Sequence, residues 1–146
     1  MKHKLGIFLG LIYLAFFGIL VFTPSGPRSQ GILPPNSATI TASTTATSGA
    51  LSSSLPAVSG RSNSICGFVI SSGGTTTASA VNVLITGTVS GTLNFQYVFV
   101  SSGQGVLGVA FPQCIGASAS NTAITVSVPG GGAGTSAALS IWGYQT

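Results

Sequence analysis

Apolar and polar side chains alternate with a period of two through the second half of the chain. In the clearest stretch, Asn94 and Gln96 fall on one face, and the opposite face is formed by Leu93, Phe95, Tyr97 and Phe99. Shorter rows with the same period occupy residues 81–85, 107–111 and 124–128. This period is typical of β-strands that bury one side.

Gly, Ser and Pro interrupt these rows at short, regular intervals. The breaks lie at residues 71–74, 90–91, 101–105, 112–120 and 129–134, and Val89-Ser90-Gly91-Thr92 is the strongest hairpin candidate. No helical period separates the rows. Six or more short strands with such turns predict an all-β fold over residues 62–146, a small antiparallel β-sandwich of jelly-roll or immunoglobulin-like type.

An uninterrupted apolar run begins at Leu5 and ends at Phe22, directly after Lys2 and Lys4. A helix of this length covers roughly 27 Å, close to the thickness of a bilayer's hydrocarbon core. No A-x-A-like cleavage site follows, which favours an uncleaved signal anchor over a cleaved signal peptide. Residues 1–22 are therefore predicted to form a transmembrane helix, with the N-terminus cytoplasmic and the C-terminus outside.

Two glycines inside this run, Gly6 and Gly10, have the spacing that lets two membrane helices pack closely. Glycine is also common in membrane helices that do not pair, so the spacing allows both interpretations.

Residues 23–61 differ sharply in composition. They hold five of the seven prolines, many Ser and Thr residues and no aromatic residue. Such a segment buries little apolar surface, so we expect a stalk or linker. The alternation over residues 38–43 also allows a first β-strand laid on the following domain.

The chain contains no Asp and no Glu, and Arg28 and Arg61 are the only charged side chains after residue 22. Carboxylate chemistry and carboxylate-bound calcium are therefore excluded, and two Cys residues without a nearby His make a poor zinc site. Two isolated arginines do not provide the basic surface that nucleic acids require. The composition predicts a protein that is not an enzyme and has no cofactor, metal or nucleic-acid partner.

Cys66 and Cys114 are the only cysteines. An exported domain could join them in a disulfide, whereas the alternative is two buried free thiols. A surface without charge also does little to prevent association through sheet edges. We therefore expect a homo-oligomer, for example a trimer, or assembly with a capsid or envelope protein.

Trp142 and Tyr144 alternate along the last predicted strand and are candidates for an interface or a glycan platform. Asn94 and Gln96 could bind glycans through neutral hydrogen bonds. Without a ligand, packing in the core would explain Trp142 and Tyr144. Ordinary solvent exposure would explain Asn94 and Gln96.

The stretch from Phe111 to Val126, FPQCIGASASNTAITV, precedes a Gly-rich turn and the terminal residues Trp142-Gly143-Tyr144-Gln145. Together they resemble the small C-terminal β-domains that recur in bacteriophage and prophage proteins, many of them structural or unassigned. The resemblance covers about residues 62–146 and carries no catalytic motif. It implies a role in a virion or in surface display.

These observations predict a non-enzymatic display or structural protein, anchored in a bilayer and presenting a small β-domain for assembly or attachment. A phage particle that contains a membrane, or the host envelope, would suit such an anchor. The alternative is a bacterial envelope or secreted module that binds a glycan or a protein.

Overall fold

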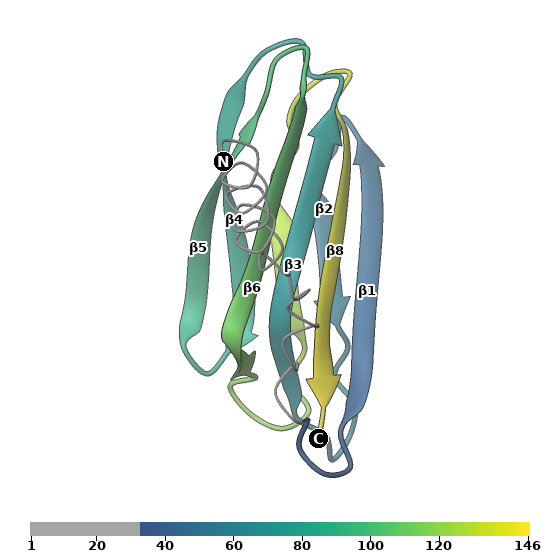
Figure 1. Cartoon of the computed structure of the whole chain (residues 1–146), viewed down its shortest axis with the longest axis vertical. Coiled ribbons are helices and arrows are strands. Elements are labelled where there is room, and N and C mark those ends of the chain that lie inside the picture. Colours follow the sequence, from purple (N-terminus) through teal and green to yellow (C-terminus); the bar gives the residue numbers. More distant parts are fainter. Residues whose placement is uncertain (1–32) are drawn as a thin grey trace, which may run out of the picture. The chain divides into compact units, whose positions relative to one another are not determined.

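Eight β-strands make up the secondary structure of residues 33–146, the part of the chain that the computed structural model describes (Figure 1). Their bounds are β1 Ala38–Thr47, β2 Leu51–Leu55, β3 Asn63–Gly73, β4 Ser79–Thr88, β5 Gly91–Phe99, β6 Gln104–Gly116, β7 Ile124–Val128 and β8 Ser136–Gln145. This part of the chain contains no helix. The predicted all-β fold is confirmed for these residues.

The strands form two antiparallel sheets of four, ordered β1-β8-β3-β6 and β2-β7-β4-β5. The pairs are nested around the middle of the chain, because β4 pairs with β5, β3 with β6, β2 with β7 and β1 with β8. All connections except the β4–β5 hairpin cross from one sheet to the other. This connectivity is that of an eight-stranded jelly roll rather than of an immunoglobulin domain.

The inner faces of the two sheets enclose one hydrophobic core. The predicted period-two rows point into it, so that Tyr97 and Phe99 are buried while Asn94 and Gln96 are exposed. The largest fully buried side chains are Phe68, Phe99, Leu51, Leu55, Ile65, Ile70, Ile85, Ile124, Leu139, Ile141, Val83 and Val126.

The predicted hairpin at residues 89–92 is the β4–β5 turn. Thr88 pairs with Gly91, and the Thr88 hydroxyl donates a hydrogen bond to the Gly91 carbonyl oxygen at 2.6 Å. Gly91 has a φ of 81°, a conformation that glycine adopts without the steric cost that other residues incur. The turn therefore requires glycine at this position.

The predicted domain boundary at residue 62 is wrong, because the β-body begins at Leu33. β1 and β2 both lie in the segment expected to be a stalk, and the strand suggested over residues 38–43 extends to Thr47. In β2, Leu51 and Leu55 are buried in the core although the residues between them are all serine. Two inward leucines are enough to fix this short strand, but they are too few to stand out in a Ser-rich sequence.

The predicted break at residues 112–120 is also partly wrong, because β6 continues to Gly116. Ala110 pairs with Gly67 and Ile115 pairs with Ile65, so four residues of β6 lie opposite the single residue Cys66. The strand thus passes through Pro112 as a bulge, an arrangement that allows proline on an edge strand.

The predicted anchor at residues 1–22, with Gly6 and Gly10, lies outside the described residues, as do residues 23–32. Among residues 33–146, no helix has the length and hydrophobicity needed to cross a membrane.

Candidate functional site

The candidate binding residues lie on opposite faces of the sandwich. Trp142 and Tyr144 belong to β8 and point away from the core on the outer face of the β1-β8-β3-β6 sheet. Asn94 and Gln96 belong to β5 and point away from the core on the outer face of the other sheet. Within one chain, the two pairs therefore cannot contact the same small ligand.

Trp142 lies against the neighbouring strand β3. A Cβ atom placed on Gly67 would stand only 2.3 Å from Trp142 Cζ2 and 2.4 Å from the Val109 carbonyl oxygen. The indole therefore covers the backbone at Gly67, and the side chain is partly buried rather than fully exposed. This contact favours the packing interpretation of Trp142 over a platform for sugars.

Gly67→Ala is expected to lower the free energy of unfolding by about 2 kcal/mol, because the new methyl group must displace the indole or the β6 backbone. Trp142 is the only tryptophan, so a red shift of its fluorescence would report greater exposure of the ring. Gly108→Ala is the matched control, since a Cβ at this β6 position meets nothing within 4 Å. Equal stability of the two variants would contradict the packing role of Gly67.

The outer face of β4 and β5 carries a small group of carboxamides. Asn82 lies directly opposite Gln96, and Asn94 lies opposite Leu84. All four side chains are exposed, and none of the carboxamides makes a hydrogen bond to another side chain among the described residues. The group is neutral and solvated, as is usual for the outer face of an antiparallel sheet.

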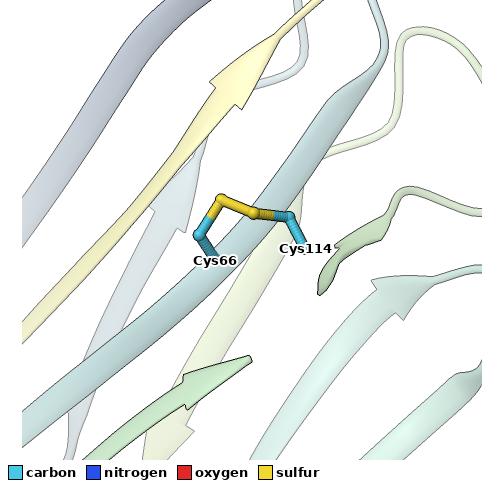
Figure 2. The surroundings of a disulfide bond; sticks show 2 residues. All are labelled: Cys66 and Cys114. Carbon is cyan, nitrogen blue, oxygen red and sulfur yellow. A yellow bond between two sulfur atoms is a disulfide. The ribbon is translucent and has the colours of Figure 1, made fainter. Parts of the chain in front are cut away.

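The structure joins Cys66 and Cys114 in a disulfide with a Cα–Cα distance of 4.2 Å (Figure 2). The bond links β3 to β6 at the bulge, where the strand register shifts between Ile65 and Gly67. It thereby fixes the irregular segment around Pro112 to the neighbouring strand. Its position indicates a structural role.

A buried polar cluster that the sequence did not reveal lies at the end of the sandwich where β3 begins. The side-chain amide nitrogen of Asn63, a residue only 1 % exposed, donates to the carbonyl oxygens of Leu55, Pro56 and Thr122 at 3.2, 3.0 and 2.8 Å. Gln145 Nε2 donates to Asn63 Oδ1 at 2.8 Å and to the Pro56 carbonyl oxygen at 3.1 Å. The cluster ties the β2–β3 and β6–β7 loops to the last strand.

The only signal for this cluster in the sequence is the spacing of two carboxamide residues from nearby apolar residues. Asn63 has the same parity as the inward-facing Ile65, and Gln145 has the same parity as the inward-facing Ile141. A polar residue on an inward position must be hydrogen-bonded to remain there, so this parity could have identified both residues.

Neither a protein-family model nor a curated protein matches this chain. The resemblance to phage β-domains therefore stays a prediction.

A shallow depression of about 390 Å³ lies near the end of β3 and the beginnings of β6 and β8. Its lining includes Ser72, Gln104 and Ser136, and none of its residues is ionisable. The depression can offer neutral hydrogen-bonding groups but no group that would transfer a proton.

Groups that could support catalysis are scarce among the described residues. This part of the chain contains no cluster of three His, Cys, Asp or Glu side chains that could hold a metal ion. Both cysteines are in the disulfide, and the buried Tyr97 hydroxyl is hydrogen-bonded to the Ser72 hydroxyl at 2.6 Å across the core. Tyr97 and the two cysteines are therefore used in holding the sandwich together, whereas Tyr144 lies on the outer face of β8.

Proposed function

We propose that this chain is a non-enzymatic structural or display protein, held at a membrane by residues 5–22 and acting as a component of a phage particle. The observation that carries the proposal is the nested strand order of the jelly roll, an architecture used repeatedly in viral capsid and lectin domains. The fold provides a surface that neighbouring proteins can contact, and residues 33–146 contain no Asp, Glu, His or Lys.

The composition supports a role in assembly rather than in chemistry. Arg61 is the only charged side chain among residues 33–146, and the whole chain has no carboxylate side chain. Recognition by such a surface relies on shape, on neutral hydrogen bonds and on apolar contact. These contacts suit a fixed neighbour in a shell better than a charged or transient substrate.

The test is mass spectrometry of phage particles purified from cultures that produce the full chain. We expect the polypeptide in the particles with residues 5–22 still attached, and we expect extraction of the lipid to release it. A chain that is missing from purified particles and present only in the host envelope would overturn the virion assignment.

The membrane part of the proposal has its own control. Leu14→Arg places a charge in the middle of the apolar run and is expected to move the chain out of the membrane fraction. Ala15→Leu at the next position keeps the run apolar and should leave the chain in that fraction. If removal of the apolar run is found by N-terminal sequencing, the anchor fails while the jelly roll remains.

The glycan-binding alternative has weaker support. Trp142 is packed over Gly67, and the exposed carboxamides lie on the opposite face. The outer faces of β4 and β5 beside them carry no aromatic residue as a stacking surface. Glycan-array binding that is lost in Asn94→Ala and Gln96→Ala would establish this alternative in place of the structural role.

A further inference from the structure

We propose that the free edge of β1 is a dimerisation surface, at which the chain pairs in antiparallel with β1 of a second copy of itself. The proposal goes beyond the suggested function, since it rests on the strand edges of residues 33–146 and not on the membrane anchor or the phage particle. The occupant is another copy of this chain.

The sandwich has four edge strands, namely β1 and β6 in one sheet and β2 and β5 in the other. Two of them carry features that prevent further pairing. β2 has only five residues, and β6 contains Pro112 within a bulge that is fixed by the disulfide. Short strands, prolines and bulges are the usual means of blocking an edge.

β1 has none of these features. It is ten residues long, is paired with β8 in an unbroken register on one side, and contains no Pro, Gly or charged residue. In Figure 1, β1 lies at the outer edge of its sheet, beside β8. Its backbone therefore presents a continuous row of hydrogen-bonding groups to a further strand.

The inward side chains of β1 are also incompletely covered. Ile40, Ala42 and Ala46 pack against the core and yet remain only partly buried, whereas the inward residues of β8 are buried from Ala137 to Gln145. A strand added to this edge would cover them.

The fourth edge, β5, is more completely closed by its own side chains. Tyr97 and Phe99 are buried, and Phe95 contacts Phe68 and Phe111 with ring-centroid distances of 5.4 and 6.2 Å. These rings cover much of the core between the two sheets on the β5 and β6 side, although Leu93 and Phe95 are themselves only partly buried. On β1, by contrast, no inward side chain is fully buried, so its edge has the less complete cover of the two.

The β1 sequence is complementary to itself when two copies run antiparallel about Ser43. On the inward side, Ile40 then lies opposite Ala46, which matches a large side chain with a small one. On the outward side, Thr39 lies opposite Thr47 and Thr41 lies opposite Thr45. Cross-strand pairs of threonine stabilise antiparallel sheets, and a two-fold contact of this kind closes on itself as a dimer.

Charge does not oppose this pairing. Arg61, the only charged side chain of the described residues, donates a hydrogen bond to the Asn36 carbonyl oxygen, just before β1 begins. In an antiparallel pair, the two Arg61 side chains lie at opposite ends of the joined strands and do not repel each other strongly.

The first test is a cysteine cross-link in the full chain, purified in detergent. The native cysteines are paired with each other, so Ser43→Cys adds a single free thiol at the proposed two-fold axis. We expect oxidation to convert most of this variant to a covalent dimer. Gln96→Cys, exposed on the edge strand β5, is the matched control and should give several-fold less dimer.

Equal cross-linking of the two variants, or no dimer from Ser43→Cys, would overturn the proposal. If the chains associated through the apolar run alone, cysteines at positions 43 and 96 would cross-link to the same extent. The comparison of the two variants therefore separates such dimers from dimers that pair at β1. Cross-linking of Ser43→Cys to a different protein would identify a foreign strand as the occupant and would also overturn it.

The second test exchanges charge at the same position. Ser43→Lys places two lysines side by side at the axis, and Ser43→Asp places two carboxylates there, so each variant alone should lose the dimer. A mixture of the two should restore it, because the opposite charges attract. Sedimentation velocity in detergent gives the readout, and a mixture that stays as dissociated as its components would contradict β1 pairing.

Discussion

Replacing Cys66 and Cys114 together by serine is expected to lower the free energy of unfolding by about 3–4 kcal/mol, because the bond closes a loop of 48 positions in the unfolded chain. For a body of this size, the melting temperature should fall by roughly 10–20 °C. Thermal unfolding of the full chain, followed by circular dichroism, measures the change.

Reduction provides the control for this prediction. A reducing agent should lower the melting temperature of the native protein to about that of the double variant and should leave the double variant unchanged. A native protein that melts at the same temperature before and after complete reduction would show that the bond between β3 and β6 contributes little to stability.

Asn63→Asp is expected to cost at least about 3 kcal/mol at neutral pH, although the two side chains have the same size. The substitution removes the donor that three carbonyl oxygens share and places a buried negative charge beside them. Asn94→Asp makes the same chemical change on the exposed face of β5 and should alter stability by no more than about 0.5 kcal/mol. Urea unfolding of the two variants gives the comparison.

The Asn63→Asp variant should also acquire a pH dependence that the native chain lacks. Burial and the surrounding carbonyl oxygens raise the pKa of the introduced carboxyl group above its unfolded value of about 3.9. Stability is then greatest below that unfolded value and is lost as the pH rises through the folded pKa. The native chain has no Asp or Glu that could produce such a change. A variant that is equally stable at pH 4 and pH 7 would contradict the charge-burial explanation.

The strands that the sequence predicts well are those with long apolar rows. The row from Leu93 to Phe99 alternates strictly, so its strand and its buried face follow directly from the side chains. In β1 and β2, by contrast, Thr, Ser and Ala occupy nearly every position, and such residues are compatible with both a linker and a strand. Only tertiary contacts decide between the two, and here Leu51 and Leu55 supply them.

The sequence does not predict where the candidate binding residues lie relative to one another. The alternation correctly places Asn94 and Gln96 on an outer face, but it does not say which sheet that face belongs to. Assignment to opposite sheets depends on the order in which the strands pair, and no residue of β5 or β8 encodes that order locally. For the same reason the contact between Trp142 and Gly67 could not be predicted, since the two residues are 75 positions apart.

The nested pairing of the strands also determines when the domain can form during synthesis. β1 is made first but pairs only with β8, the last strand, which inserts between β1 and β3. A nascent chain can close the β4–β5 hairpin and then join β3 to β6, whereas β1 stays without its sheet partner until β8 has been translated. A chain that stops before residue 136 would leave β1 and β3 unjoined, so the sandwich closes only after β8 has been made.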